Sequence, residues 1–310
     1  MAVWLVTGGS GFLGRHVLKA LSATGEVDVL AMGRRCPDRW PGHRFLTADL
    51  EELESLAQRI EEARPDVVIH TAGRTPPGAP ELFFRSNTLA SVHLLEALAG
   101  LKRRVRVVLA GSAAELGPVE AEALPVGENR VCRPIDAYGL SKYLASCAAL
   151  AARPPVEAIV ARVFNPIGPG QPGRQALGRF AEALADEREE TLMVGDLDVR
   201  RDFVDVRDVA RAMIALGEKG EAGRVYHVGT GASHRVADAL MHLMGKRGRK
   251  VAIQVDSKLA ASAGPTDSVA DIGRIVKDTG WRPEIGWEQS LEDLWEEARS
   301  RRVLPLTGLK

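Results

Sequence analysis

The sequence predicts an α/β fold in which a doubly wound parallel sheet is followed by a smaller, mixed α/β domain. Short β-branched runs alternate with helix-length segments over the first half of the chain, which is the pattern of repeated βαβ units. After Arg162 the segment NPIGPGQPG opens a region of short strands and helices separated by Gly and Pro. The length of 310 residues, against about 150 for a typical domain, also favours two domains.

The expected elements of the first domain alternate strictly. Strands are expected at 2–7, 27–32, 44–48, 66–72, 105–110 and 156–162, and helices at 12–23, 51–62, 81–99 and 136–152. Further helices are expected at 176–187 and 289–299. We therefore divide the chain into a dinucleotide-binding domain, 1–164, and a substrate-binding domain, 165–310, with 204–230 returning to the first domain.

Composition excludes several classes of partner. Hydrophobic residues make up 45% of the chain, charged residues 26%, and the formal net charge is zero, so no electrostatic footprint for nucleic acid or membrane is present. No apolar stretch approaches the roughly 18 residues of a membrane span, and we expect a cytoplasmic protein. Cys36, Cys132 and Cys147 form no CxxC pair and no HExxH occurs, so neither disulfides nor a metal site are expected.

A glycine-rich segment, TGGSGFLGRH, joins the first expected strand to the first expected helix. In such a unit Gly8 permits a tight turn, Gly11 lets the backbone approach a pyrophosphate, and Gly14 lets helix and strand pack closely. The helix amino terminus presents free N–H groups and a positive dipole end to the phosphates. The segment predicts a Rossmann-like cofactor site that includes Phe12 and Leu13.

The end of the second strand indicates which dinucleotide binds. A carboxylate there would bind the ribose 2′-hydroxyl of NAD, whereas arginine accommodates the 2′-phosphate of NADP. The chain reads AMGRRCPDR, with Gly33, Arg34 and Arg35 at this position. We expect NADP, with NAD as the alternative, although both arginines could instead be solvated surface charges.

The segment TADLEE follows the third expected strand and contributes two further candidates, Asp49 and Leu50. Asp49 could accept a hydrogen bond from the adenine amino group of the cofactor. It could equally cap a helix that begins at Glu51.

Three polar residues predict the chemistry. Tyr138 and Lys142 in DAYGLSKYLAS lie four apart on an expected helix, so their side chains share a face. A neighbouring ammonium favours the phenolate and is expected to lower the pKa of Tyr138 from about 10, which makes the phenol a usable acid. Ser112 follows a strand at the edge where such sheets bind ligands, and its hydroxyl could bond a reacting carbonyl oxygen.

These residues together resemble the extended short-chain dehydrogenase/reductases, the NAD-dependent epimerase/dehydratase family. The resemblance is carried by GGSGFLG, Ser112, the Tyr138/Lys142 pair, VFNPIGPGQ and RRDFVDVRDVA, and it runs from Val3 to about Ala298. Within the family, GSAAELGPVEAEALPV and DTGWRPEIGWEQSLEDLWEEA are most similar to the branch that reduces GDP-4-dehydro-6-deoxymannose.

The resemblance implies several binding residues. Asn165 and Arg201 match positions that hold the nucleotide sugar, the arginine on its phosphates, although Arg201 could simply pair with Asp202 or Asp205. A second group matches the surroundings of the nicotinamide and comprises His70, Thr71, Ala72, Gly73 and Asn87. For His70 we favour the interpretation of a hydrogen-bonded core histidine.

Two departures from the family pattern bear on substrate and reaction. Dehydratases carry an acidic residue two positions after the catalytic Ser/Thr, where this chain has Ala114, and Glu115 stands one place late. Side chains alternate in direction near a strand, so Glu115 should point elsewhere and dehydration is disfavoured. An arginine that reaches the diphosphate in relatives is replaced near Ala263 and Gly264. Either Arg201 or Lys258 compensates for it, or the substrate is not the usual one of the family.

The resemblance implies NADPH-dependent reduction of a nucleotide-linked 4-keto-6-deoxy sugar, with hydride from nicotinamide and a proton from Tyr138. Three alternatives stay open: a nucleotide-sugar 4-epimerase with tightly bound NAD, a reductase of a small non-nucleotide carbonyl compound, and a redox-sensing binding module. The family also implies a homodimer through a four-helix bundle built from helices 81–99 and 136–152, although burial within one chain explains the same apolar faces.

The two arginines after the second strand can be tested directly. Substituting both, Arg34→Ala with Arg35→Ala, should weaken NADP binding far more than NAD binding, because only NADP carries the 2′-phosphate. Calorimetric titration with each cofactor measures the difference. Equal losses for the two cofactors would contradict the assignment.

Overall fold

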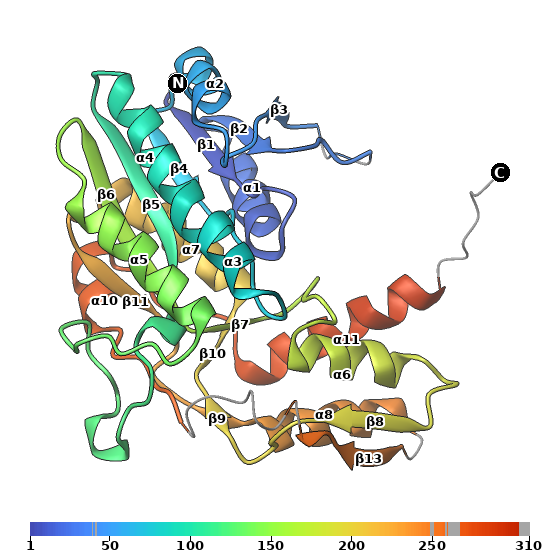
Figure 1. Ribbon diagram of the computed structural model, residues 1–310. Helices are drawn as coiled ribbons and strands as arrows, with labels where there is room; N and C mark the ends of the chain where they lie inside the picture. Colours follow the sequence, from blue (N-terminus) through green and yellow to red (C-terminus); the bar gives the residue numbers. More distant parts are fainter. Residues whose placement is uncertain (39, 41, 249–250, 258, 260–266, 304–310) are drawn as a thin grey trace.

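A seven-stranded, wholly parallel sheet organises the chain in the computed structural model, which describes residues 1–38, 40, 42–248, 251–257, 259 and 267–303. The strand order is β11-β6-β5-β4-β1-β2-β3 (Figure 1). The strands are β1 (Val3–Thr7), β2 (Asp28–Gly33), β3 (Arg44–Thr47), β4 (Val67–His70), β5 (Val105–Ser112), β6 (Val156–Val163) and β11 (Val225–Val228). The predicted doubly wound sheet is confirmed.

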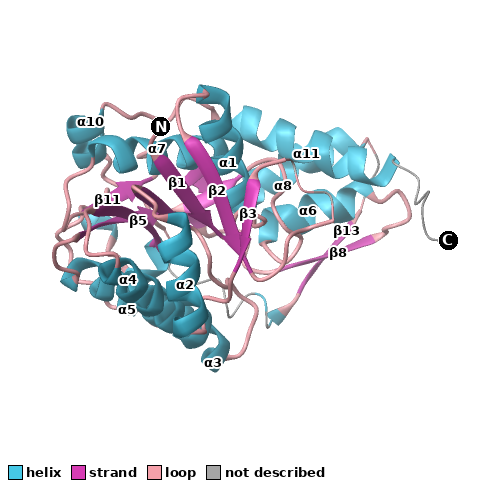
Figure 2. Cartoon of the chain, turned by 90° about the horizontal axis from the view of Figure 1, so that it is seen from above, coloured by secondary structure: helices cyan, strands magenta, loops and turns pink. Residues whose placement is uncertain are grey.

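Helices cover both faces of this sheet (Figure 2). One face carries α1 (Phe12–Thr24), α7 (Val206–Lys219) and α10 (Gly273–Thr279), and the other carries α2 (Leu53–Ala63), α4 (Ala90–Gly100) and α5 (Ala137–Ala151). Successive strand side chains point to opposite faces, so Val6 is buried in one core and Leu5 in the other. Both side chains are fully buried, because a central parallel strand has no solvent face.

A second lobe follows the sheet and has its own core around Phe180, Leu240, Leu291 and Trp295. Its helices are α6 (Ala176–Ala185), α8 (Val236–Arg247) and α11 (Trp287–Val303). Its strands form three pairs: β7 (Asn165–Ile167) with β10 (Phe203–Asp205), β8 (Thr191–Val194) with β13 (Ala252–Val255), and β9 (Arg200–Arg201) with β12 (His234–Arg235). This is the smaller mixed α/β part that the sequence predicts, and α7 and β11 return from it to the sheet. The domain boundaries themselves stay a prediction.

Two expected helices differ from the structure. The helix expected at 51–62 begins at Leu53, because the Asp49 carboxylate and carbonyl hold the N–H groups of Glu51 and Glu52 in a turn, at 3.0 and 3.1 Å. The helix expected at 81–99 is divided into α3 (Pro80–Phe83), a π-helical turn over Phe84–Leu89 and α4. Over the described ranges, no helix combines the length and apolar character that a bilayer crossing requires.

Candidate active site

The predicted site residues meet at the carboxyl edge of the sheet. Gly8 follows β1, Thr71 follows β4, and Ser112 is the last residue of β5. The chain leaves β1 towards one face and β4 towards the other, so the crevice between these two neighbouring strands is the topological switch point. Open α/β sheets bind ligands at this point.

The glycine turn fits a dinucleotide. Gly8 has φ of 71°, and a Cβ there would lie 2.6 Å from the Ala72 nitrogen. A Cβ on Gly14 would lie 2.2 Å from the Gly8 carbonyl oxygen, so α1 packs against the turn only without a side chain. Gly11 is the N-cap residue of α1, and no side chain in the described part of the chain bonds the first-turn N–H groups there. These donors and the helix dipole favour a pyrophosphate.

A buried chain of hydrogen bonds lies beneath the turn. The Thr7 hydroxyl lies 2.6 Å from Nδ1 of His70, whose Nε2 lies 3.0 Å from the Ser91 hydroxyl. Ser91 donates to the Asn87 carbonyl at 2.6 Å, so it accepts from His70 Nε2 and leaves Nδ1 to accept from Thr7. Burial, and secondarily the charge of Lys142, lower the pKa of His70 to about 3. His70 is therefore a neutral, hydrogen-bonded core histidine.

Asn87 joins the loop after β4 to helix α5. Its side-chain oxygen accepts from the Arg74 N–H at 2.7 Å, and its amide donates to the Arg74 carbonyl at 3.0 Å and the Ser141 hydroxyl at 2.9 Å. Gly73 packs on this amide, because a Cβ there would lie 2.7 Å from the side-chain oxygen. The sequence singled out Asn87 and Gly73, but nothing in it pointed to Arg74 or Ser141 as their partners.

The three expected catalytic residues converge. The Ser112 side chain hydrogen-bonds Tyr138, and Lys142 donates from Nζ to the carbonyl of Ala110, two residues before Ser112. Asp136 sets the start of α5, since its side chain accepts from the Gly139 N–H at 2.6 Å. The helix therefore presents both functional groups to the end of β5.

The expected direction of the Tyr138 pKa shift is wrong. Burial raises the pKa of Tyr138 above its usual range, the Ser112 hydrogen bond opposes this, and the charges of Glu115 and Asp136 add to it. The Lys142 ammonium is directed to the Ala110 carbonyl, and burial lowers its own pKa. Desolvation of the phenolate outweighs the expected effect of the ammonium, so Tyr138 is held protonated.

The residues proposed for the far end of the dinucleotide lie in more exposed positions. Arg34 is exposed, and Arg35 makes a 3.5 Å ion pair with Asp38 in which both side chains are more than four-fifths exposed. Asp49 is held in the turn before α2 rather than capping that helix. Leu50 packs on the core, and its carbonyl lies 3.1 Å from His93 Nδ1.

The expected substrate residues lie at the start of the second lobe. Asn165 donates its side-chain amide to the Asp202 carbonyl at 3.1 Å. Arg201 lies on β9, half-buried, and bonds the Arg200 carbonyl at 2.6 Å. Asp202 accepts N–H bonds from Thr230, Gly231 and Ala270, and Asp205 pairs with Arg207 at 2.8 Å. Lys258, Ala263 and Gly264 lie outside the described residues.

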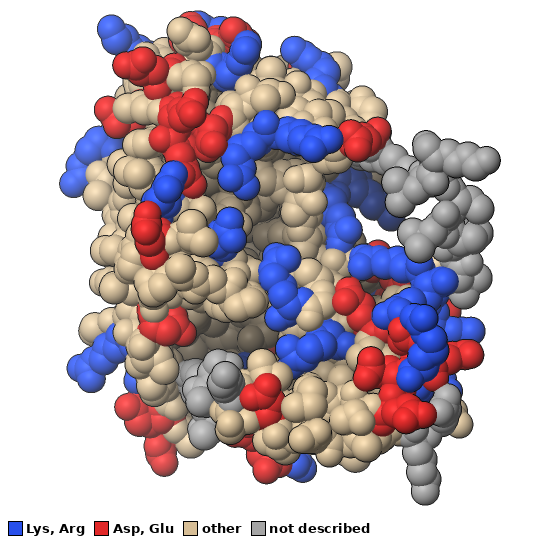
Figure 3. All heavy atoms as spheres, turned by 45° about the vertical axis from the view of Figure 1, so that its right-hand side comes forward, with Lys and Arg blue, Asp and Glu red and all other residues tan. Residues whose placement is uncertain are grey.

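Figure 3 shows a face that is hollowed between the two lobes, with Lys and Arg side chains along the hollow. Several contacts connect α1 and the loop after β4 to the loop after β7. Arg15 donates to the Gly170 carbonyl, His16 Nε2 lies 2.9 Å from the Pro169 carbonyl, and Arg174 donates to the Thr75 hydroxyl at 3.2 Å. Among the residues that the structure describes, no group of three His, Cys, Asp or Glu could hold a metal ion.

A doubly wound sheet with a glycine turn at its switch point, and Ser, Tyr and Lys side chains at the same edge, describes the dinucleotide-dependent α/β enzymes. Comparison with known proteins is more specific: residues 4–229 match the NAD dependent epimerase/dehydratase family. The chain belongs to this family, and its resemblance to the extended short-chain dehydrogenase/reductases is confirmed.

Three relatives illustrate the range of the family. The chain is 32% identical to the GDP-6-deoxy-D-mannose reductase of Pseudomonas aeruginosa, over 96% of this chain and 97% of that protein. It is 29% identical to the UDP-glucose 4-epimerase of Azospirillum brasilense, over 93% and 92%. The structure of RMD from Pseudomonas aeruginosa complexed with NADPH superposes with a TM-score of 0.84 at 31% identity, covering 97% of this chain and all of that one.

Burial of His70 makes stability depend on pH. The pKa of His70 is about 3 in the folded protein against 6.5 ordinarily, so the unfolded chain binds the extra proton and stability falls as pH drops below 6.5. The loss is about 1.4 kcal/mol per pH unit. In His70→Gln the decrease in unfolding free energy between pH 7 and pH 5 should be smaller by about 2 kcal/mol, measured by urea denaturation.

His227→Gln provides a comparison, because burial and the charge of Arg162 also lower the pKa of His227 to about 3. The His227→Gln substitution should reduce the pH dependence of the unfolding free energy by a similar amount. Unfolding curves with the same pH dependence in the wild type and both variants would contradict the assignment of neutral buried histidines.

Proposed function

We propose that the protein reduces the 4-keto group of a nucleotide-linked 6-deoxy sugar, with NADPH as the hydride donor. The observation that carries this proposal is the hydrogen-bonded Ser112 and Tyr138 side chains at the carboxyl end of β5, beside a glycine turn that fits a dinucleotide. The activity printed for the Pseudomonas relative, together with the NADPH in its structure, supports the substrate class and the cofactor.

The cofactor would lie across the switch point. Its pyrophosphate would meet Gly8, Gly11, Phe12, Leu13 and Gly14, with Arg34 and Arg35 at the 2′-phosphate. The remaining contacts would come from Asp49 and Leu50 at the adenine and from Thr71, Ala72, Gly73 and Asn87 towards the nicotinamide. When bound, NADPH supplies the hydride.

The chain's own residues supply the proton and hold the carbonyl. Tyr138 carries its proton at neutral pH, and burial further disfavours the free phenolate, so the proton is available to the carbonyl oxygen as negative charge develops there. Ser112 binds the same oxygen and orients it. Lys142 holds α5 to the end of β5 through the Ala110 carbonyl, and Asn165 and Arg201 would bind the nucleotide sugar.

Epimerisation with retained NAD is the second candidate, favoured by the likeness to the UDP-glucose 4-epimerase. The two functions differ in cofactor turnover. A reductase releases oxidised cofactor in proportion to product, whereas an epimerase shows no net change in nicotinamide absorbance. Dehydration is not supported, because the carboxylate nearest to Ser112 in sequence is fully buried in the protein interior.

Loss of the phenol should abolish reduction. Tyr138→Phe removes only the proton donor, so turnover of a GDP- or dTDP-linked 4-keto-6-deoxy sugar with NADPH should fall by at least about a hundredfold while NADPH affinity stays nearly unchanged. Nicotinamide absorbance and calorimetry measure the two quantities.

The matched control is Tyr143→Phe on the same helix, whose hydroxyl bonds Cys147 and which should retain activity. Near-normal turnover by Tyr138→Phe would refute the proposed proton donor. Epimerisation without net cofactor oxidation in the wild type would favour the second candidate.

We also propose a homodimer in which α4 and α5 of two copies form a four-helix bundle. Large apolar side chains are exposed along this side of the molecule, on α3, the π-helical turn, α4 and α5: Leu82, Leu89, Val92, Leu140 and Leu144. Several exposed apolar side chains on neighbouring helices are typical of an interface. The free Cys36, Cys132 and Cys147 are in keeping with a reducing, cytoplasmic location.

A charge in this face should break the dimer. Leu144→Glu is expected to give a monomer, because the interface would bury a carboxylate on each copy without a partner of opposite charge. Light scattering after size-exclusion chromatography measures the mass. The matched control is Ile253→Glu. Ile253 lies on β13 in the other lobe and is 44% exposed. A wild-type monomer, or an unchanged dimer in Leu144→Glu, would contradict the interface.

A further inference from the structure

Glu115 is a fully buried carboxylate three residues after Ser112. The family pattern gives it no role in elimination, and its offset from the dehydratase position turns it away from the cleft. The structure shows where it points: into the protein interior, between the end of β5, helix α5 and strand β6. A buried charge persists only when it is paired and hydrogen-bonded, so its partners indicate what it does.

Each carboxylate oxygen of Glu115 has a protein partner. Oε1 accepts from the Ser112 N–H at 2.7 Å and from the Ser146 hydroxyl at 3.0 Å. Oε2 accepts from Nε of Arg162 at 3.1 Å. Ser112 ends β5, Ser146 lies on α5 and Arg162 lies on β6, so one carboxylate joins three elements that meet at the site. Gly111 leaves the space, because a Cβ there would lie 2.7 Å from Oε1.

We propose that Glu115 is a positioning residue that holds the Ser112 hydroxyl against Tyr138 by fixing the end of β5 to α5 and β6. The proposal rests on the proposed function, in which Ser112 and Tyr138 bind the reacting carbonyl. Its geometric basis is a capping box: Ser112 Oγ accepts from the Ala114 N–H at 3.2 Å while Glu115 accepts from the Ser112 N–H. The box fixes the backbone and the side chain of Ser112 together.

Arg162 is held on its other side. Its Nη1 lies 3.2 Å from His227 Nε2, and its Nη2 donates to Cys132 Sγ at 3.2 Å. His227 Nδ1 donates to the Val126 carbonyl at 3.0 Å, which leaves Nε2 to accept from the guanidinium. These two contacts orient the guanidinium of Arg162, which in turn holds the carboxylate of Glu115.

The charge of Glu115 also reaches the catalytic pair. The groups that act on the ionisation of Tyr138 are Ser112 on β5, Glu115 in the turn after it, and Asp136 at the start of α5, with Lys142 one helical turn further along. The negative charges of Glu115 and Asp136 disfavour the phenolate and raise the pKa of Tyr138. Removing the Glu115 charge must therefore lower it. Glu115 also raises the pKa of Lys142 against the larger opposing effect of burial.

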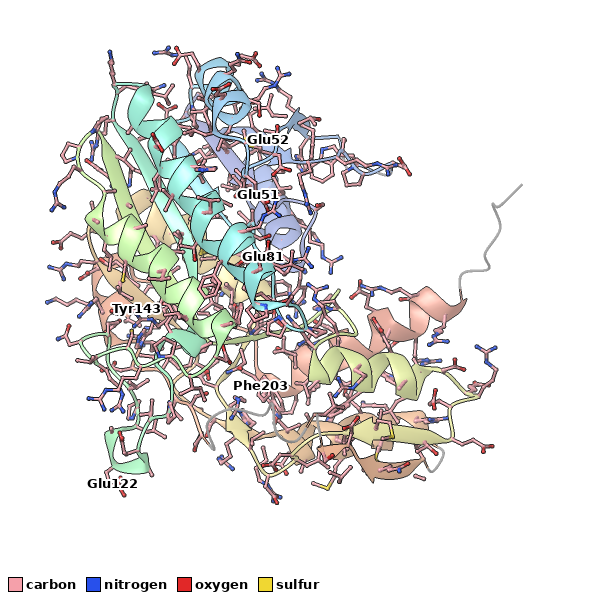
Figure 4. All side chains as sticks on the ribbon, viewed as in Figure 1. Glu51, Glu52, Glu81, Glu122, Tyr143 and Phe203 are labelled. Carbon is pink, nitrogen blue, oxygen red and sulfur yellow. The ribbon has the colours of Figure 1, made fainter. Side chains whose placement is uncertain are left out.

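The first test needs no turnover. The chain has three tyrosines, Tyr138, Tyr143 and Tyr226; Figure 4 shows Tyr143 on α5. The difference in tyrosinate absorbance between proteins with and without the Tyr138→Phe substitution isolates the ionisation of Tyr138. In Glu115→Gln the midpoint for Tyr138 should move to lower pH, because glutamine keeps an acceptor oxygen but loses the charge. Circular dichroism over the same pH range confirms that the chain stays folded.

Glu128→Gln is the matched control for this titration. Glu128 accepts from the His227 N–H at 3.2 Å and pairs with Arg274 at 3.6 Å, and it is not among the charges that act on Tyr138. Its loss should leave the midpoint unchanged. A midpoint that stays fixed in folded Glu115→Gln, or that moves equally in Glu128→Gln, overturns the electrostatic part of the proposal.

The second test separates positioning from stability. Glu115→Ala should lower kcat on the order of tenfold to a hundredfold with KM nearly unchanged, because a displaced hydroxyl costs transition-state stabilisation. Glu115→Ala with Arg162→Gln removes the unpaired charge and should restore Tm without restoring kcat. If kcat recovers with Tm, Glu115 is only structural and the proposal is wrong. A wild type that reduces no 4-keto sugar nucleotide refutes the proposed function instead, while the titration still tests Glu115.

Discussion

The close approach of two backbone segments, at Gly8 after β1 and at Ala72 after β4, is the constraint on which the carboxyl edge of the sheet depends. A side chain at Gly8 would lie 2.6 Å from the Ala72 nitrogen. The same register places Thr7 directly beside His70 on the neighbouring strand, so their side chains hydrogen-bond under the turn. The bonds continue through Ser91 to Asn87, and from Asn87 to α5. The glycine turn after β1 and helix α5 are thus joined by one buried network of hydrogen bonds.

Several ionisable side chains are buried together at this site. Tyr138 and Lys142 lie in a region where burial disfavours the charged form of both side chains, and the buried Glu115–Arg162 ion pair lies close by. The Glu115–Arg162 pair offsets the cost of burial through a direct hydrogen bond, whereas Tyr138 avoids that cost by remaining protonated. A protonated phenol suits a reaction that delivers a proton to an alkoxide, which is the direction of the proposed reduction.

The second lobe is held to the sheet by a buried carboxylate of its own. Asp202 accepts three N–H bonds from the segments at 230–231 and 270, and its backbone carbonyl accepts from Asn165. Arg201 precedes it on β9, so the strand proposed to reach the substrate phosphates is anchored one residue away. Phe203, labelled in Figure 4, stacks on Trp287 at 4.9 Å and continues this junction into the second lobe.

The sequence by itself determined whatever is encoded locally: the order of strands and helices, the glycine turn, and the four-residue spacing that puts Tyr138 and Lys142 on one face of α5. Only the tertiary structure decided what depends on distant segments. Asn87 and Ser141 are 54 residues apart, and Glu115 and Arg162 are 47 apart, so neither pair leaves a pattern along the chain. The direction of the Tyr138 pKa shift also depends on segments that are distant in the sequence. Spacing along a helix shows which charge is near, but desolvation is set by every element packed around the phenol, and here it is the larger effect.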